Sequence, residues 1–424
     1  MTASSTANRT SRPPAFTIPT RLRDPGILPR TVQVLGNNSS SLTLPGSNSS
    51  ASQVWLSPIL VTSHAVGLQD EAIRLLVIFR GSLATWMDIF DFSETYQREV
   101  CCRAAHSRLV LCCICAITAK HLSLMPSGEM WQPTASRYYI EALQHLITAL
   151  GHLGSGTNGD ELTASMLLGS YEMISASGAP YISHYQGARD LIRSQNISAT
   201  SSGIDRANFF IYARHEISIA LVREGPLQLD PNDWNMPPQP PTGVGEDEMG
   251  NYLLWLSGKA INLIYSNDVT PANRNSLIDR VDDWYTRTTE TLRGISYGGL
   301  DEEGLQKLFF AVPAAAAAML WYHLTRILLL AEPELLDPAS EALVQNHTKS
   351  ILDIAISRIT PGVRCFAIMP VYFAGKHDAE VSRKMRAYTI LDEIQRDVGH
   401  NTQDRMRSLS RVILQAPRLI PSGP

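Results

Sequence analysis

The sequence predicts an all-α protein built as a multi-helix array. From about residue 70 onward, apolar residues recur at spacings of three and four, the repeat of helices that bury one face. Short breaks containing Pro or Gly separate these segments at an even rhythm, and no alternating strand pattern rises above background. With 44% hydrophobic and 18% charged residues, most of the 424-residue chain is expected to fold. We expect one all-α domain over residues 54–424.

The first 53 residues differ in composition and are predicted to be a disordered tail. They are rich in Ser, Thr, Asn and Pro, as in NNSSSLTLPGSNSS, and poor in aromatic residues. Such a segment cannot bury enough apolar surface to offset the entropy of ordering it. It lacks the continuous apolar core of a secretory signal, although its Ser, Thr and Arg content also occurs in transit peptides.

Charge and hydropathy exclude two further classes. Lys plus Arg number 36 and Asp plus Glu number 40, so the net charge of −4 does not favour a dedicated nucleic-acid surface. The longest apolar run, 309–322, contains Pro313 and is shorter than the roughly 20 residues that a membrane-spanning helix needs. We therefore predict a soluble protein with no membrane partner.

Three helices are expected before residue 151. The first is amphipathic and contains DEAIRLLVIF, and the second opens at Ser93 and Glu94 and continues to about residue 122. The second half of that helix is apolar nearly all round, which is typical of a central buried helix, and Pro126 and Gly128 end it. The third helix covers 135–150.

Five of the six cysteines lie within fifteen positions, from Cys101 to Cys115. They are too close along one helix for a disulfide framework. We interpret them as small buried hydrophobic residues in a reducing compartment, in preference to metal ligands.

Residues 154–159 match the dinucleotide-binding pattern G-x-G-x-x-G, but they stand between two predicted helices. Because that fingerprint requires a strand, a tight turn and a helix in that order, we interpret it as an interhelical loop. Asp160 is then the expected N-cap of the next helix.

Residues 161–234 are the most informative stretch. Helices are expected over 162–175, over 181–192 and from Asp205 onward, and a turn containing Pro and Trp234 closes the stretch. The motifs in order are LLxSYEMxSA, HYxGARDLIR, FFxYxRxEIxxAL and RExPLxLDPxDW. This order resembles the regulatory domain of fungal binuclear zinc-cluster transcription factors, the fungal-specific transcription factor domain. The residues that carry the resemblance are Ser170, Tyr171, Glu172, His184, Gly187, Ala188, Leu191, Ile192, Arg214, Glu216, Ile217, Pro226, Leu229, Asp230, Pro231, Asp233 and Trp234.

The resemblance implies an all-α regulatory domain in the nucleus, with a small-molecule effector and a protein partner or DNA-bound transcription factor as candidate partners. The family's DNA-binding module is an N-terminal cluster of six closely spaced Cys among Lys and Arg, which holds two zinc ions. This sequence has no Cys before Cys101. We therefore expect no zinc, no cofactor and no direct sequence-specific DNA binding. The chain is a regulatory domain alone, a truncated regulator, or a divergent member recruited to another task.

After Trp234, residues 235–250 are predicted to form an internal loop rich in Pro, Gly and acidic residues. Helices are expected over 252–265 and 277–292, and again from Asp301 into an apolar segment that Pro313 kinks or ends. The last helices are expected over 340–359, 376–398 and 403–414.

No catalytic or metal constellation is recognised. The sequence has no G-x-S-x-G, H-E-x-x-H or Walker A motif, and His215-Glu216 lacks a second His one turn later. Asp279, Asp282 and Asp283 approach the aspartate-rich motif of helical cyclases but lack its final Asp, so a solvated helix face is the preferred interpretation. His184 and His323 are interpreted as core histidines in preference to acid–base groups.

Aromatic density in the family-like stretch predicts an effector cavity with polar groups at its edge. Its candidate residues are Tyr171, Tyr181, His184, Tyr185, Phe209, Tyr212, Arg214 and Trp234. Arg189, Arg214 and Arg223 are expected to pair with Glu172 and Glu216 between helices.

The leading interpretation is a non-catalytic transcription regulator that controls a metabolic or secondary-metabolite pathway. The alternative is a helical small-molecule-binding protein or an enzyme without a recognisable motif, such as a cyclase or isomerase. The expected location is the nucleus by resemblance and otherwise the cytoplasm.

Overall fold

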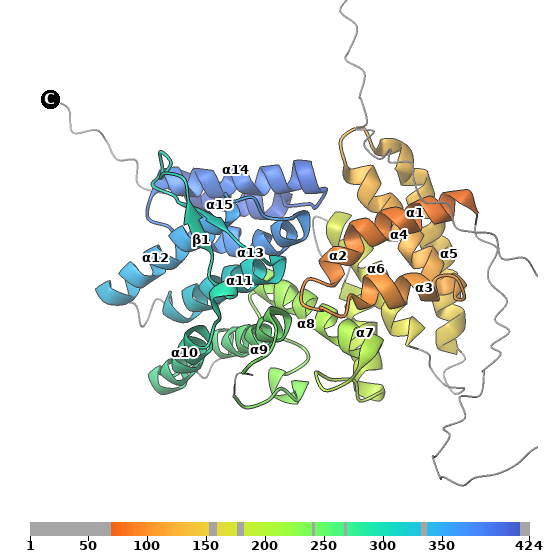
Figure 1. Ribbon diagram of the computed structural model, residues 1–424, viewed down its shortest axis with the longest axis horizontal. Coiled ribbons are helices and arrows are strands. Elements are labelled where there is room, and N and C mark those ends of the chain that lie inside the picture. The colour runs from red at the N-terminus through yellow and green to blue at the C-terminus, as the bar shows by residue number, and fades with distance from the viewer. Residues whose placement is uncertain are drawn as a thin grey trace, which may run out of the picture. The chain divides into compact units, whose positions relative to one another are not determined.

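The computed structural model describes residues 69–151, 159–175, 182–239, 242–266, 269–331 and 337–415. Within them it is an array of helices with one small sheet, which confirms the all-α prediction (Figure 1). The predicted tail, 1–53, and most of the G-x-G-x-x-G segment lie outside the described residues. The α-helices are α1 (Asp70–Gly81), α2 (Leu83–Met87), α3 (Cys101–Arg103), α4 (Arg108–Leu124), α5 (Gln132–Gly151), α6 (Asp160–Ser175), α7 (Ile182–Ser194), α8 (Gly203–Arg223), α9 (Glu246–Ile264), α10 (Pro271–Thr286), α11 (Pro313–Leu330), α12 (Pro338–Ala355), α13 (Pro361–His377), α14 (Val381–Val398) and α15 (Gln403–Gln415). The shorter elements are η1 (Tyr96–Val100), η2 (Glu129–Trp131), η3 (Pro231–Trp234), η4 (Glu290–Leu292), β1 (Ile295–Tyr297) and β2 (Lys307–Phe309).

Helix α4 is the centre of the N-terminal helices. Its sequence is apolar on every side, and its residues from Leu109 to Ala119 are all buried. Helices α1, α5 and α6 pack around it (Figure 1). The predicted central buried helix is therefore confirmed, with Cys112, Cys113 and Cys115 as buried free thiols.

Helix α11 is the centre of the C-terminal helices, where α9, α12 and α13 pack around it. Its first turns, Ala314–Ala318, carry only methyl side chains, which permits close approach of neighbouring helices. Thr325 and Ser257 of α9 share a hydrogen bond of 2.7 Å between their hydroxyls. By length and composition Pro313–Leu330 is apolar enough to cross a bilayer, but 89% of it is buried against the rest of the protein, as in a core helix.

Helix α8 connects these two groups, because it contacts α6, α7 and η1 as well as α9. A buried chain of hydrogen bonds fixes its N-terminal half. The Tyr96 hydroxyl donates to Asn208 Oδ1 at 2.6 Å, and Asn208 Nδ2 donates to Thr163 Oγ1 at 2.9 Å. Asn208 is fully buried, so losing either partner would leave a desolvated polar group.

Gly250 in α9 permits the close approach of Phe90, which follows α2. A Cβ at this position would overlap the Phe90 ring. Asn251 Nδ2 donates to the Phe90 carbonyl at 2.9 Å, and the Phe90 ring meets the edge of Phe366 of α13 at 5.7 Å. One glycine thus allows α9, the α2 region and α13 to meet.

Two predicted helices have different bounds. The helix expected over 93–122 is interrupted, because η1 and α3 end at Arg103 and Ser107 then caps α4 by accepting from Val110 N. The expected cap also shifts, because Asp160 lies inside the first turn of α6. Asp160 instead pairs with Arg103 at 3.1 Å.

The helix predicted from Asp301 is wrong, since this region forms an antiparallel hairpin in which Ile295 pairs with Phe309. The Asp301 carboxylate accepts hydrogen bonds from the backbone of Glu303 and Leu305, which makes the acidic residues a turn. Pro313 neither kinks nor ends a helix. It starts α11, because the first helical position needs no backbone N–H.

Helix α13 is absent from the predicted elements, and the predicted loop over 235–250 ends early because α9 begins at Glu246. Pro370 lies inside α13 and conceals its helical period in the sequence. Three acidic residues at the start of α9 favour its N-terminus through the helix dipole, which explains why this helix begins earlier.

Several imidazoles pack against the core. His121 Nε2 contacts the Val398 carbonyl at 3.0 Å, and the Nδ1 atoms of His323 and His347 are 2.8 Å apart. His377 stacks on Phe373. Burial lowers the pKa of each, to about 4 for His347 and His377. The core-histidine interpretation of His323 agrees with this placement.

We predict that Gly250→Ala destabilises the domain by ~1–3 kcal/mol, because the added methyl group must displace Phe90 from a filled core. Gly187→Ala is the matched control, since Gly187 is exposed within α7 and its Cβ would meet nothing within 4 Å. This control should gain ~0.5–1 kcal/mol from helix propensity. Urea unfolding measures both, and equal changes in the two variants would contradict the account.

We predict that stability falls as pH falls from 6.5 to about 4. The core imidazoles have lowered pKa values when folded, so the unfolded chain binds more protons in this window and gains population. Asp88, whose pKa burial raises to about 6, and Glu216, whose pKa burial also raises, act in the opposite direction but are fewer than the imidazoles. The free energy of unfolding should drop by ~2 kcal/mol or more between pH 7 and pH 5. Equal values at these two pH values, measured by denaturant titration, would refute this.

Candidate functional site

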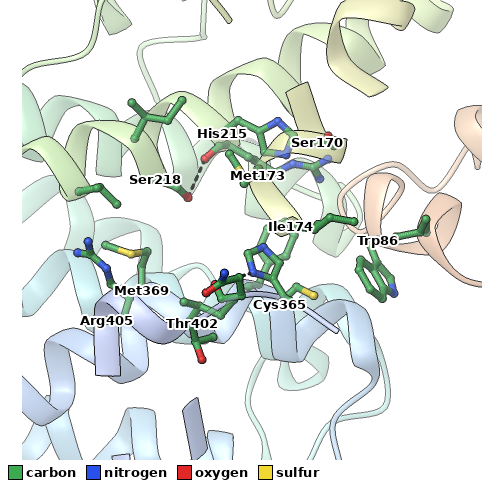
Figure 2. Close-up of a pocket in the computed structure, with 18 of the residues that line it drawn as sticks. Trp86, Ser170, Met173, Ile174, His215, Ser218, Cys365, Met369, Thr402 and Arg405 are labelled. Carbon is green, nitrogen blue, oxygen red and sulfur yellow. Dashed lines mark hydrogen bonds between the residues drawn. The ribbon is translucent and has the colours of Figure 1, made fainter. Parts of the chain in front are cut away.

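A cavity of about 200 Å³ lies where helices of both groups meet. Figure 2 shows α8 on one side, the end of α6 and Trp86 of α2 beside it, and α13 with the segment after α14 on the opposite side. An apolar cavity of ~150 Å³ is enough to hold a benzene-sized molecule. The lining residues are Leu83, Trp86, Met87, Ile117, Ser170, Met173, Ile174, Arg214, His215, Ser218, Ile219, Val222, Trp321, Cys365, Phe366, Ile368, Met369, His400, Asn401, Thr402, Asp404 and Arg405.

Each helix contributes a stripe of residues three or four positions apart, the spacing that places side chains on one helical face. On α8 the stripe is Arg214, Ser218 and Val222, and on α6 it is Ser170 and Ile174. On α13, Cys365, Phe366, Ile368 and Met369 form the corresponding face. The cavity is therefore a place where several amphipathic faces converge without filling the space between them.

The segment after α14 closes the cavity by binding the end of α6. Gly399 takes the left-handed conformation, with φ +69°, and terminates α14. Asn401 then donates its backbone N–H to the Ile174 carbonyl at 3.0 Å and its side-chain amide to the Ser175 carbonyl at 3.2 Å. These bonds satisfy carbonyls that the last turn of α6 leaves unpaired.

Arg214 is the most enclosed charge in the lining, with only 6% of its surface exposed. Its Nη2 donates to the Met87 carbonyl at 2.6 Å, and its guanidinium lies 5.3 Å from the centre of the Phe366 ring. Burial lowers the pKa of Arg214 to about 10, against the opposing influence of Asp88. The side chain is therefore still a cation at neutral pH.

His215 and His400 present neutral imidazoles to the cavity. Burial, reinforced by Arg214, lowers the pKa of His215 to about 3, and burial lowers that of His400 to about 4. The Tyr185 hydroxyl lies 2.8 Å from His215 Nδ1. Gly169 of α6 leaves room for the Tyr185 ring, because a Cβ there would lie 2.9 Å from it. The imidazoles thus act as hydrogen-bonding groups and not as charges.

The chemistry of the lining is that of a binding site. Ser170, Ser218 and Thr402 donate their hydroxyl protons to the carbonyls of Met166, Arg214 and Leu391. Burial raises the pKa of the Cys365 thiol well above its usual value, so this thiol is protonated and a poor nucleophile. The arrangement can bind a compact molecule with an apolar body and orient it by a few polar contacts.

The structure distributes the predicted cavity residues among several places. Arg214 lines the cavity, and Tyr185 reaches it only through His215. Tyr185 and Tyr212 line a second cavity of about 20 Å³, the size of one water molecule. The remaining residues lie elsewhere: Phe209 and Trp234 meet edge-on in the core, Tyr171 stacks on Tyr139, His184 lies beside Tyr139 and Glu172, and Tyr181 is outside the described residues.

The prediction that Arg189, Arg214 and Arg223 form ion pairs with Glu172 and Glu216 is wrong, because both carboxylates have other partners. The Glu172 carboxylate accepts from the Tyr139 hydroxyl at 2.5 Å. The Glu216 carboxylate accepts from the backbone N–H groups of Gln228 and Leu229, at 2.9 Å for Leu229.

The hydrogen bonds that Glu216 accepts explain the RExPLxLDPxDW motif, because they fix the turn after α8. Asp230 caps η3 by accepting from Asn232 N at 2.9 Å, and Trp234 Nε1 donates to the Leu229 carbonyl at 3.2 Å. Trp255 Nε1 of α9 donates to the Pro231 carbonyl at 2.7 Å. The motif therefore builds a structural turn that seats α9.

Most residues that line the cavity were not predicted. Those of α13 were missed because the helix itself was missed, although Thr360-Pro361 followed by an apolar run is a helix-start signal that finds it. Residues 400–405 reach the cavity because the chain turns at Gly399. A Gly directly after the last residue of a helix, here Val398, indicates such a turn in the sequence.

One group of side chains has the composition of a metal site. The ligand atoms of Cys112, Glu141 and His145 lie within 4.8 Å of one another. However, Arg108 Nε donates to the Glu141 carboxylate at 2.8 Å, and burial raises the pKa of the Cys112 thiol to about 12. A carboxylate that is already paired with Arg108 is a poor ligand for a cation, so this group is not assigned as a metal site.

Comparison with known proteins gives one match, to a family model that covers part of the chain. Residues 74–253 match the fungal-specific transcription factor domain. No curated protein and no solved structure shows a significant match. The matched region contains the cavity residues of α2, α4, α6 and α8, whereas those of α11, α13 and 400–405 lie beyond it. The sequence-based resemblance is thus confirmed over residues 74–253, which match the model of the fungal-specific transcription factor domain.

Proposed function

We propose that this chain is a transcription regulator whose helical domain responds to a small molecule bound in the cavity. The family match supports the regulatory role. The single observation that supports the response is the cavity itself, which is apolar, holds a few convergent polar groups and is lined by helices from both groups.

The position of the cavity gives a physical route from binding to response. A bound molecule would contact α6 and α8 on one side and α13 and 400–405 on the other. A ligand shifts a conformational equilibrium only when it binds one arrangement more tightly than another. A molecule that touches both groups at once has this property, because a change in their packing alters its contacts.

The proposal includes a nuclear location and contact with DNA through a partner. The sequence has no Cys before Cys101, and its net charge is −4. Burial raises the pKa values of the Cys101 and Cys115 thiols to about 11 and about 12, as for thiols packed against a core. A DNA-bound transcription factor is the partner that this charge balance and cysteine spacing favour.

We predict that cavity-filling abolishes ligand binding. In Met369→Trp the larger ring occupies the space beside Phe366, so compounds that raise the melting temperature of the wild type should bind at least tenfold more weakly. Met130→Trp is the matched control, because Met130 is 77% exposed and far from the lining. Isothermal titration measures both, with circular dichroism confirming the fold.

Equal loss in both variants, or no loss in Met369→Trp, would contradict the assignment of the cavity as the site. Conversion of a bound compound to a product would instead favour the enzyme alternative.

We also predict that the chain regulates transcription when another domain supplies the DNA contact. Fused to an unrelated sequence-specific DNA-binding domain, it should change reporter expression several-fold, and a cavity ligand should alter that change. The unfused chain should give no sequence-selective band shift. A reporter that ignores the fusion, with or without ligand, would argue against the regulatory role.

A further inference from the structure

Arg214 differs from Arg326, the other buried arginine among the described residues, in having no carboxylate partner. Arg326 is also buried, yet it pairs with Asp282, and Arg383 pairs with the buried Asp378 at 2.9 Å. Across the residues that the structure describes, Arg214 forms no ion pair, and its hydrogen bond is to the Met87 carbonyl. A guanidinium has five N–H donors. A charge removed from water without a counter-ion is costly, so the cavity has an unmet requirement for an anion.

The nearest acidic residues do not meet this requirement. Asp88 and Asp91 act on Arg214 electrostatically without forming an ion pair with it, and the Asp88 carboxylate is held by hydrogen bonds from Tyr96 N and Gln97 N, each at 2.9 Å. Asp404, the acidic residue in the lining, pairs with Arg407 at 3.0 Å. Arg214 therefore has no carboxylate in direct contact, and Arg405 adds a second cation to the lining.

The surroundings of Arg214 favour a flat apolar group next to the anion. The Phe366 ring lies under the Arg214 guanidinium, with the ring centre 5.3 Å away. The Phe90 ring meets the Phe366 ring edge-on. Trp86, Met173, Ile219 and Met369 form apolar walls beyond it. An aromatic body packed on these side chains places its acidic group at Arg214, where a carboxylate matches the planar fork of donors.

We infer that the cavity is selective for a small organic anion, a carboxylate on an aromatic or similarly flat apolar body, with Arg214 as its counter-ion. This inference rests on the proposed function, since it names the chemical class that the same cavity binds.

The test uses pairs of probes that differ only in charge. Arylalkanoates such as 4-phenylbutanoate and indole-3-acetate are titrated into the full chain beside their uncharged carboxamides, with binding measured by calorimetry and thermal shift. The acids are expected to bind the wild type at least tenfold more tightly than the amides, equal to about 1.4 kcal/mol.

Arg214→Met should remove this preference by weakening the acids at least tenfold while changing the amides less than threefold. Arg214→Lys keeps the charge and should retain the preference for acids, which separates loss of charge from loss of fold. Arg396→Met is the control outside the lining, with its side chain 58% exposed, and it should leave every affinity unchanged.

Two results overturn the inference. One is equal binding of acid and amide by the wild type, and the other is a preference for acids that survives in Arg214→Met. If amides bind and Met369→Trp blocks them, the cavity still binds ligands and only the charge preference fails. If no probe and no metabolite in a broad screen binds, the proposed function itself fails.

Discussion

Two helices that cannot face water, α4 and α11, determine how the rest of this domain is arranged. Each is apolar on every side, so each must be surrounded by other helices. Helices α1, α5 and α6 surround the first, and α9, α12 and α13 surround the second. The two groups of helices pack against each other through elements that contact both of them. Helix α8 and the contacts around Gly250 have this role.

The cavity is a consequence of that arrangement. Amphipathic faces of α6, α8 and α13 converge where the two groups meet, and residues 400–405 close the space by binding the end of α6. Phe90, Phe366 and Arg214 form a continuous set of contacts from the α9 helix to the cavity wall. A change in the packing of the two groups therefore alters the surroundings of Arg214, which is the property that a ligand-responsive domain needs.

Sequence patterns predicted the helices in which the helical period is unbroken. The prediction failed where a side chain takes the place of a backbone hydrogen-bond partner. The hairpin at 295–309 was missed because the Asp301 carboxylate makes a turn from residues that also suit a helix start. Helix α13 was missed because Pro370 interrupts its pattern, although its apolar neighbours hold it in the core.

The sequence predicted a cavity with aromatic and polar residues, but most of the residues that line the cavity in the structure were not predicted. Of the eight residues that were expected to line an effector cavity, Arg214 is the one that the lining of this cavity contains. Tyr171 is on α6, Tyr185 is on α7, Phe209 and Tyr212 are on α8, and Trp234 is on η3. A helix displays its side chains in every direction, so nearness in sequence did not bring them together. Trp234 and Glu216, the most distinctive residues of the family-like stretch, build the turn that seats α9.

The central claim is that the cavity at Arg214 holds an anionic small molecule. A crystal structure of the full chain with an arylalkanoate bound tests it most directly. The account predicts the carboxylate within hydrogen-bonding distance of the Arg214 guanidinium and the aromatic body against Phe366 and Met369. A ligand bound elsewhere, or a protein carboxylate paired with Arg214 in its place, would contradict it.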